Sequence, residues 1–583
     1  MELAEQIVSQ LQAAGVRRIY GIVGDSLNPI VDAVRRTGGP SKPDGIQWVH
    51  VRHEEAAAFM ASADAQLTGE LAVCAGSCGP GNLHLINGLY DANRSGAPVL
   101  AIASHIPSPQ IGTGYFQETH PDRLFTECSV FSEMITSADQ SPRIVDSAMH
   151  HAIAKQGVAV ITLPGDVAQN EVTKDAPAWR DVVEPTLVPD AGAVAELVSM
   201  IDAADKVAIF AGLGARGSRE KIVALADKLG APVGHSLRGK DFVQDENPFD
   251  VGMTGLLGYG AAAAGMNDAD LLLLLGTDFP YDQFLPGTKT VQIDRDAAVI
   301  GRRTPVDLGI AADLAPTLDL VLKAVKPKKS RKFLRDTLKK HDRLMGGTNA
   351  YTKNVKKMKP IHPEYVAAVL DELAAPDAIF TADTGMCNVW TARYLHTNDN
   401  RRLIGSFKHG SMANALPQAL GAQFAYPDRQ VISVSGDGGL SMLLGELVTA
   451  AMYQLPVTIL AFNNSTLGMV RLEMLVDGLP DFGTDVPDVS YAKVAEALGF
   501  HAERVTEAKD VYKALNDALN HKGPSLVEVM TDPDALSLPP AVTGEQLIGF
   551  ATAMSKIVLG GGAGEVISMA KSNLRNIPRE WKL

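Results

Sequence analysis

Short apolar runs rich in Val, Ile, Leu and Ala recur along this 583-residue chain, and segments with helical spacing separate them. The runs lie at residues 17–24, 71–76, 99–104, 158–165, 206–212, 271–278, 290–294, 378–383, 430–436, 457–464 and 525–530. Strands that are apolar throughout and alternate with helices are typical of parallel sheets covered on both faces. The pattern therefore predicts an α/β fold of three doubly wound parallel-sheet domains.

Two irregular segments divide this pattern into three parts. Residues 171–192 contain prolines and charges without a clear period. Residues 323–359 contain fourteen Lys or Arg but two acids. In a chain of net charge −14 this run is more typical of a solvated helix and linker than of a nucleic-acid surface, so no nucleic-acid partner is expected. We predict domains at 1–180, 190–335 and 361–540, a linker at 336–360 and a C-terminal tail at 541–583.

A weak internal repeat relates the first and last domains. Residues 54–79 and residues 412–436 both pass through a small-residue helix and an apolar strand into a glycine-rich turn. The similarity is short, but it predicts that the two domains share one strand topology.

The composition limits the classes of protein to which the chain can belong. Its first fifteen residues include Glu2 and Glu5 at helical spacing, which is not the pattern of a secretory signal. No apolar window reaches the roughly 20 residues that a spanning helix needs. Four scattered cysteines, Cys74, Cys78, Cys128 and Cys387, are too few for a disulfide framework. We expect buried thiols and a reducing cytoplasm.

The stretch SGDGGLSMLLGELVTAAMYQLPVTILAFNN, residues 435–464, has the pattern of one strand–helix–strand unit. Such a unit places the turns that follow its two parallel strands at the same edge of the sheet, so Asp437 and Asn464 are expected to converge. A carboxylate and an amide oxygen suit Mg²⁺, while Gly436 and Gly438 leave the backbone open to a bulky anion. A helix that begins here would direct free N–H groups at that anion. The stretch therefore predicts a diphosphate held through Mg²⁺.

Together with the motifs VRHEEAAAF, CAGSCGPGN, FQETHP, GMTGLLGYG, GTDFPY, GSFKHGSMANALPQALGAQ and NNSTLGMV, this pattern resembles the thiamine diphosphate (ThDP) enzymes. Most of the chain is similar to their pyruvate oxidase branch, and within it to the acetate-forming, quinone-linked pyruvate dehydrogenases. The resemblance implies the three-domain fold of that family and the cofactors ThDP, Mg²⁺ and FAD.

The resemblance also implies roles for individual residues. Asp437, the side chain of Asn464 and the backbone oxygen of Thr466 would bind Mg²⁺. Glu54 would contact the cofactor's pyrimidine ring from the opposite subunit, although Glu55 is a rival by position. Phe116 and Gln117 would lie beside the substrate, and Glu473 would lie in the segment between ThDP and FAD; these three and Glu54 are the catalytic candidates. The remaining ThDP contacts would be Gly410, Ser411, Met412, Gly438, Gly439, Ser465, Leu467, Gly468, Met469 and Val470.

The middle domain contains Gly212-x-Gly214-x-x-Gly217, which formally matches a dinucleotide fingerprint. Nicotinamide binding is an alternative there, but no acid follows at a suitable second strand end. The resemblance implies FAD instead. Its contacts would be Arg238, Met253, Thr254, Gly255, Leu256, Gly276, Thr277, Asp278, Phe279, Pro280 and Asp294.

The expected activity is oxidative decarboxylation of pyruvate to acetate and CO₂, with electrons passing through FAD to ubiquinone or menaquinone. The resemblance implies a homotetramer with active sites between subunits. Alternatives are an O₂-using, phosphate-dependent pyruvate oxidase, an acetolactate synthase, and an inactive membrane-associated scaffold. The basic, amphipathic end of the tail, with Trp581, either packs on its own protein or lies on an anionic membrane. The resemblance favours the membrane, on the inner face of the cell membrane.

Overall fold

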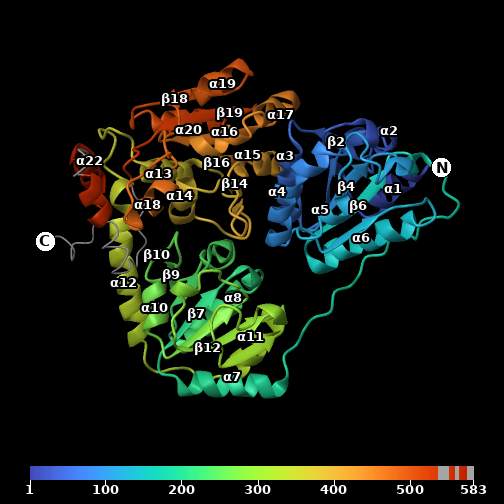
Figure 1. Ribbon diagram of the computed structural model, residues 1–583. Coiled ribbons are helices and arrows are strands. Elements are labelled where there is room, and N and C mark those ends of the chain that lie inside the picture. Colours follow the sequence, from blue (N-terminus) through green and yellow to red (C-terminus); the bar gives the residue numbers. More distant parts are fainter. Residues whose placement is uncertain (536–550, 558–562, 574, 576–583) are drawn as a thin grey trace.

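The computed structural model describes residues 1–535, 551–557, 563–573 and 575, and within them the chain forms three α/β domains, each built on one sheet (Figure 1). The predicted α/β class with three parallel-sheet domains is confirmed. All eleven apolar runs contain strands, because a chain buried on both faces of a sheet has no polar side to display.

The N-terminal sheet has six parallel strands in the order β2-β1-β3-β4-β6-β5. Its strands are β1 (Arg18–Gly21), β2 (Gln47–His50), β3 (Ala72–Gly76), β4 (Val99–His105), β5 (Phe131–Met134) and β6 (Val158–Pro164). Its helices are α1 (Leu3–Ala13), α2 (Asn28–Arg36), α3 (Glu54–Thr68), α4 (Pro80–Ser95), α5 (Pro121–Leu124) and α6 (Ser141–Lys155).

The C-terminal sheet has the order β15-β14-β16-β17-β19-β18. Its strands are β14 (Ile379–Ala382), β15 (Arg402–Gly405), β16 (Val431–Gly436), β17 (Val457–Asn463), β18 (His501–Val505) and β19 (Ser525–Met530). Its helices are α13 (Pro363–Leu373), α14 (Met386–Tyr394), α15 (Ala415–Ala425), α16 (Asp437–Met442), α17 (Glu446–Tyr453), α18 (Gly468–Val476), α19 (Tyr491–Ala497) and α20 (Val511–Leu519). Counted along the chain, both outer sheets follow one order, second-first-third-fourth-sixth-fifth, which confirms the predicted shared topology.

The middle sheet has seven strands in the order β10-β9-β8-β7-β11-β12-β13. Its strands are β7 (Val207–Ala211), β8 (Val233–His235), β9 (Asp250–Met253), β10 (Tyr259–Gly260), β11 (Leu271–Leu275), β12 (Lys289–Asp294) and β13 (Leu308–Ala311). Its helices are α7 (Ala191–Ala203), α8 (Arg219–Leu229), α9 (Lys240–Val243), α10 (Ala262–Asn267), α11 (Leu314–Ala324) and α12 (Lys332–Thr348). The edge pair β9–β10 is antiparallel, so this sheet is mixed rather than wholly parallel.

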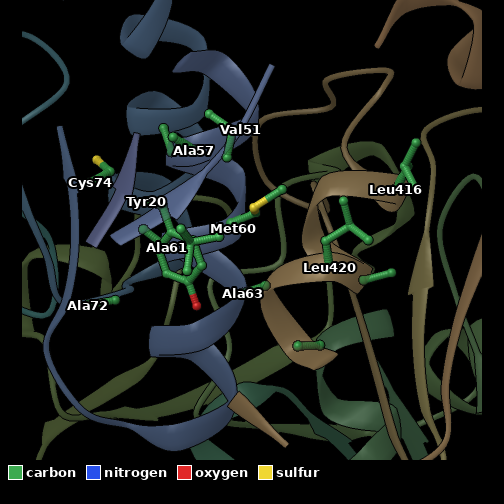
Figure 2. Packing of buried hydrophobic residues seen from close by; sticks show 14 of the residues in the cluster. Tyr20, Val51, Ala57, Met60, Ala61, Ala63, Ala72, Cys74, Leu416 and Leu420 are labelled. Carbon is green, nitrogen blue, oxygen red and sulfur yellow. The ribbon is translucent and has the colours of Figure 1, made fainter. Parts of the chain in front are cut away.

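The N-terminal and C-terminal domains pack on each other through α3 and α15, two helices of mostly small residues (Figure 2). Met60 and Ala61 of α3 share one buried cluster with Leu416 and Leu420 of α15. Small side chains let the two backbones approach closely and bury a continuous apolar surface. The internal repeat found in the sequence includes both helices.

The connecting segments differ in structure. Residues 172–190 contain no helix or strand, as predicted, and cross from the first domain to α7 (Figure 1). The basic run forms the long helix α12, so the predicted boundary at residues 335 and 336 falls within a helix. Helix α22 (Ala563–Asn573) packs on the C-terminal domain, where Met569 shares a buried cluster with Leu472 and Leu475 of α18. Leu574, Arg579, Trp581 and Lys582 of the predicted membrane tail lie outside the described residues.

None of the described helices is both long and apolar enough to cross a membrane. All four cysteines are buried and unpaired, as the sequence predicts.

Candidate functional site

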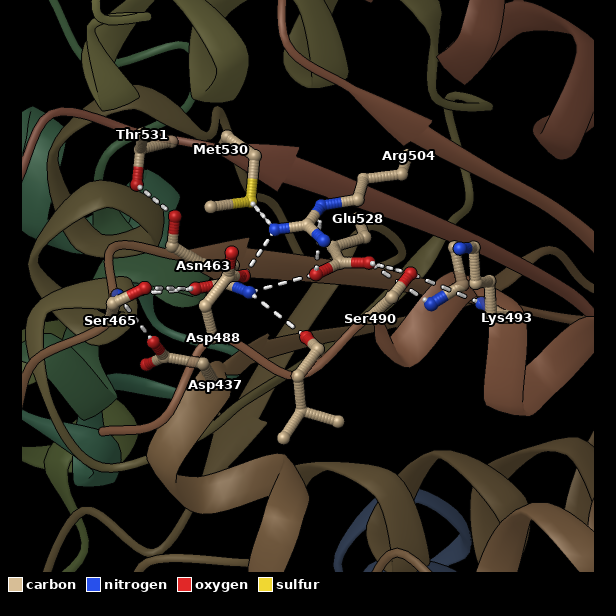
Figure 3. Close-up of polar contacts among 12 residues, drawn as sticks. Asp437, Asn463, Ser465, Asp488, Ser490, Lys493, Arg504, Glu528, Met530 and Thr531 are labelled. Carbon is tan, nitrogen blue, oxygen red and sulfur yellow. Dashed lines mark hydrogen bonds and ion pairs between the residues drawn. The ribbon is translucent and has the colours of Figure 1, made fainter.

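Asp437 and the Asn464 segment meet at the carboxyl end of the C-terminal sheet (Figure 3). Strands β16 and β17 pair in parallel, so the residues that follow them are neighbours. The carboxylate of Asp437 accepts a hydrogen bond from the N–H of Ser465 at 2.7 Å and another from the N–H of Gly438 at 2.8 Å. The strand–helix–strand pattern predicted that Asp437 would meet the Asn464 segment although 464 − 437 = 27 residues separate them, and the hydrogen bond from Ser465 shows this contact.

Residues 464–468 form a tight turn beside this carboxylate. The amide oxygen of Asn464 accepts the N–H of Thr466 at 3.2 Å, and Ser465 has a left-handed backbone with φ +54°. A Cβ on Gly468 would lie 3.1 Å from the amide nitrogen of Asn464. The turn therefore holds the predicted metal ligands next to one another at the start of α18.

The residues of this site fit a magnesium-bound diphosphate. Asp437 is 3% exposed, and burial raises the pKa of its carboxyl to about 6. A nearby cation would offset that burial, and a carboxylate with an amide oxygen is a hard ligand set. A Cβ on Gly438 would lie 2.6 Å from Leu467 and 3.4 Å from Met412, so this glycine lets three predicted cofactor segments meet.

Asn463, the first of the two asparagines, connects the turn to strand β19. It was not assigned a role from the sequence. Its amide nitrogen donates to Glu528 of β19 at 2.7 Å, and its amide oxygen accepts the N–H of Ser465 at 3.1 Å (Figure 3). Glu528 also accepts the N–H of Ala492 at 3.1 Å. Both Asn463 and Glu528 are completely buried. Adjacent strands supply these partners, and the spacing along the chain gives no sign of their contact.

Asp383 is a second residue that the sequence did not single out. It follows β14, the strand next to β16, where the connections of this sheet change direction and ligands of such folds bind. One of its carboxylate oxygens has no hydrogen-bond partner, and burial raises the pKa of Asp383 to about 7. Gly439 lies against this carboxylate so closely that a Cβ would overlap it. Asp383 therefore belongs to the floor of the candidate site.

The neighbouring glutamates Glu54 and Glu55 begin α3 and point to different partners. Glu54, 7% exposed, has its carboxylate 2.8 Å from Nδ1 of His84. Glu55 accepts a hydrogen bond from Asn87 at 2.6 Å, and the same amide donates to the hydroxyl of Ser411 at 2.9 Å. One predicted cofactor residue, Ser411, thus connects to the rival Glu55. Gly410 beside it is exposed and has φ +79°.

The residues predicted beside the substrate are not gathered into one cluster within a single chain. Phe116 is 78% exposed, whereas Gln117, with φ +62°, lies against Gly79 and accepts a weak bond from the thiol of Cys78 at 3.4 Å. Glu473 of α18 is exposed as a whole, while partial burial of its carboxyl and then the charge of Asp477 raise the pKa of that carboxyl. Val470 is 43% exposed, while Met469 packs on the C-terminal core.

Two loops of the middle domain meet at the point where its strand order reverses. Gly214 donates its N–H to the carbonyl of Gly276 at 2.9 Å, and a Cβ on either glycine would approach the other backbone. The fingerprint glycines therefore let the loops after β7 and β11 touch, which is a structural reason for their presence. Such a reversal point is also where nucleotide cofactors bind in doubly wound sheets.

The residues predicted to contact FAD lie around that point. Met253, Thr254, Thr277 and Phe279 are buried, while Leu256 and Pro280 are exposed and Gly255 has φ +104°. Asp278 forms ion pairs with Arg302 and Arg303.

Two further charged residues in the FAD prediction have partners within the protein. The guanidinium of Arg238 donates to the carbonyl of Ser95 at 2.6 Å. Asp294 accepts the N–H of Asp296 at 3.0 Å, and burial raises the pKa of its carboxyl. Both would have to share these contacts with a bound cofactor.

The middle domain also contacts the C-terminal domain near the candidate site. Met253 and Tyr259 pack on Ala392 of α14. Burial raises the pKa of Tyr281, and the negative charge of Glu473 on α18 raises it further. A separate cavity of about 1200 Å³ lies between these domains, lined by residues such as Lys240, Tyr259, Tyr365 and Arg393, but it contains no predicted site residue.

The structure defines a three-domain α/β protein with a candidate site at the strand ends of its C-terminal sheet, and comparisons with known proteins give its family. Models of the thiamine pyrophosphate enzymes match residues 1–124 (N-terminal TPP binding domain), 194–321 (central domain) and 383–529 (C-terminal TPP binding domain). Thiamine pyrophosphate is another name for ThDP. The Bacillus subtilis protein YdaP, which is named for thiamine pyrophosphate, is 36% identical over 96% of this chain and 97% of its own length.

Two other relatives carry names of activities. A pyruvate oxidase of Lactiplantibacillus plantarum is 30% identical over 91% of this chain and 88% of its own. An acetolactate synthase of Mycobacterium bovis is also 30% identical, over 93% of this chain and 90% of its own. The chain belongs to the thiamine pyrophosphate enzymes.

Proposed function

We propose that this protein is a ThDP-, Mg²⁺- and FAD-dependent pyruvate dehydrogenase that transfers electrons to a membrane quinone. In the balanced reaction, pyruvate, water and quinone give acetate, CO₂ and quinol. The observation that carries the proposal is the convergence of Asp437 with the Asn464 turn, beside a helix whose Glu473 influences Tyr281 of the middle domain. In this proposal the two organic cofactors bind on either side of the contact between the middle and C-terminal domains.

Each residue of the candidate site has a distinct task in this proposal. Asp437, Asn464 and the backbone oxygen of Thr466 would bind Mg²⁺, and Met412 would support the cofactor's bent form. Glu54 would exchange a proton with the pyrimidine ring, which suits a carboxyl that is 7% exposed. When bound, ThDP supplies a carbon nucleophile and an electron sink for loss of CO₂. Gln117 and Glu473 would orient the substrate carboxylate and a water molecule.

The oligomer and the membrane partner are part of the same proposal. Phe116 and Phe482 are 78% and 89% exposed in the single chain, and a partner subunit that completes the site would cover such side chains. If sites form between subunits, mixing the Glu54→Gln and Asp437→Ala variants should restore part of the activity that each lacks. Membrane contact through the end of the tail rests on its basic, amphipathic sequence and on the resemblance.

The direct test is an anaerobic titration of the purified holoenzyme with pyruvate while the flavin absorbance is recorded. The proposal predicts bleaching that requires ThDP and Mg²⁺, and reoxidation by a quinone analogue with acetate as product. Acetyl phosphate formed with O₂ would indicate a phosphate-dependent pyruvate oxidase instead. Acetolactate without flavin reduction would indicate an acetolactate synthase, and no reaction at all would favour an inactive scaffold. Because two relatives are named pyruvate oxidase and acetolactate synthase, the formation of acetyl phosphate and the formation of acetolactate are the important alternative outcomes.

A further inference from the structure

His53, Glu54 and His84 form a cluster of side chains that can ligate a metal, and none of the three is a predicted magnesium ligand. Their ligand atoms all lie within 4.8 Å of one another, and within the described ranges no other group of three or more His, Cys, Asp or Glu does so. Nδ1 of His84 is 2.8 Å from the carboxylate of Glu54, and the ring of His53 stacks on that of His84 at 4.3 Å and 27°. Three possible ligand atoms therefore lie close together, and the stacked imidazole rings have to turn to direct their nitrogens at one ion.

The chemistry of this cluster suits a transition-metal ion rather than magnesium. Two imidazoles and one carboxylate are ligands that zinc accepts in sites with an open fourth position. Imidazole selects Zn²⁺, Cu²⁺, Ni²⁺ and Co²⁺, whereas Mg²⁺ prefers oxygen ligands and retains its water. An excess of Mg²⁺ should therefore leave this cluster free.

The geometry needs a small adjustment that the surroundings permit. Tetrahedral ligands at about 2.1 Å from zinc lie about 3.4 Å apart. The pair of His84 and Glu54 at 2.8 Å therefore has to open, and separations of up to 4.8 Å have to close. The side chains of His53 and His84 are 36% and 44% exposed and can rotate, while that of Glu54 is 9% exposed and fixed at the start of α3. The N–H of Glu55 donates to Nδ1 of His53 at 3.2 Å and holds that ring nearby.

We propose that His53, Glu54 and His84 bind a divalent transition-metal ion such as Zn²⁺, and that this ion inhibits the enzyme by occupying the Glu54 carboxylate. The ligands are the Glu54 carboxylate and two neutral imidazoles, so the ion takes the place of the hydrogen between Glu54 and Nδ1 of His84 and that ring carries its one proton on Nε2. Neither the ion nor the protein changes oxidation state. The binding part stands on the cluster alone, whereas the inhibitory part rests on the proposed role of Glu54 toward ThDP.

Calorimetric titration of Zn²⁺ into tag-free, ThDP-free, full-length protein in excess Mg²⁺ tests the binding part. We expect one site per chain, with His84→Gln weakening it at least about tenfold, since even a partner outside the ligand set is worth about 10–100-fold. His521→Gln is the matched control, because His521 stacks on His501 at 5.1 Å outside this cluster. A wild type without the site, an unchanged His84→Gln variant, or equal loss in both variants would overturn the proposal.

Two measurements on the wild type do not depend on a substituted protein. Bound Co²⁺ should give visible absorption of a low-symmetry nitrogen and oxygen site, and one equivalent of Zn²⁺ should remove it. Saturation with ThDP and Mg²⁺ should weaken Zn²⁺ binding at least tenfold if both need Glu54. Zn²⁺ binding unaffected by ThDP would contradict the inhibitory part. None of these readouts needs turnover of pyruvate, so they succeed or fail independently of the proposed reaction.

Discussion

Glu54 and Glu55 are adjacent in sequence, but the structure gives them different environments. Glu54 faces His84, while Glu55 holds Asn87, which in turn holds Ser411. A residue that exchanges a proton with a cofactor needs an ionisable carboxyl, which an amide cannot replace. A residue that only accepts a hydrogen bond can be replaced by an amide. The two residues can therefore be distinguished by the same conservative substitution.

Glu54→Gln is expected to lower kcat for pyruvate decarboxylation about 10²–10⁴-fold, the usual contribution of a general acid–base group. Glu55→Gln keeps an acceptor for Asn87 and should cost less than about tenfold, the worth of roughly one ordinary hydrogen bond. CO₂ release at saturating ThDP measures both variants. Equal losses, or a larger loss for Glu55→Gln, would mean that the rival glutamate has the catalytic role.

The sequence predicted contacts between residues of one strand–helix–strand unit. It missed contacts between residues that come together only when distant strands pack in the fold. Asp437 and Asn464 follow neighbouring strands of one strand–helix–strand unit, so their convergence follows from the topology of that unit. Asn463 and Glu528 are 65 residues apart, and Asp383 reaches Gly439 from another strand. Such contacts leave no periodic signal in a single sequence.

At the scale of elements, the crossing of α3 and α15 depends on a glycine. A Cβ on Gly421 of α15 would overlap the backbone carbonyl of Met60 on α3, and a backbone cannot move aside as a flexible side chain can. Gly346 of α12 is a helical glycine with open space around its Cβ position. The pair separates the effect of packing from the effect of helix propensity.

Gly421→Ala should destabilise the protein by about 1–3 kcal/mol through overpacking. Gly346→Ala should stabilise it by about 0.5–1 kcal/mol, because alanine restricts the unfolded chain and fits the helix without strain. Thermal unfolding midpoints of the two variants test this, with a decrease expected for the first and a small increase for the second. A midpoint for Gly421→Ala at or above that of the wild type would show that the helices have room to separate.

The strands predicted from apolar runs all lie in the interior of the sheets. Each apolar run contains such a strand, whereas edge strands such as β5 and β18 mix polar with apolar residues and gave no run. Strands β8 and β9 are interior but only three and four residues long, with an irregular register between them. Short or half-exposed strands do not need continuous apolar sequence, and so the pattern could not reveal them.

At the scale of the whole molecule, one buried carboxyl lies where all three domains meet. Asp91 of α4 accepts hydrogen bonds from Ser62 and from Gln418 of α15, each at 3.1 Å, and its other oxygen has no partner. Arg238 of the middle domain reaches the end of the same helix through the carbonyl of Ser95. Burial raises the pKa of Asp91 to about 6, although Ser406, Ser62, Arg238 and Gln418 oppose the rise.

This raised pKa predicts a pH-dependent stability with a definite sign. The folded state binds the proton of Asp91 more tightly than the unfolded chain, whose value is 3.8. The site's stabilising contribution is therefore full below that value and is lost as the pH rises through about 6. The complete window corresponds to roughly 3 kcal/mol, at about 1.4 kcal/mol per pKa unit.

The Asp91→Asn variant cannot titrate and should not lose this contribution. Relative to the variant, the wild type should become less stable as the pH rises from about 4.5 to about 8, as measured by urea unfolding. Asp517→Asn is a control, because the Lys513 pair at the surface lowers the pKa of Asp517 and reverses the sign. A wild-type-minus-variant difference that is flat with pH would show that Asp91 is not a titrating group of the junction.

The central claim is that Asp437 and the Asn464 turn bind the diphosphate of ThDP through Mg²⁺, and calorimetric titration of ThDP tests it most directly. The wild type should bind ThDP in Mg²⁺ and not in a chelator, and Asp437→Ala should weaken binding at least about 100-fold, since a buried charged ligand is removed. Asp488→Asn, a change at a nearby surface ion pair with Arg504, should bind as the wild type does. Tight, Mg²⁺-independent binding by Asp437→Ala would contradict the account.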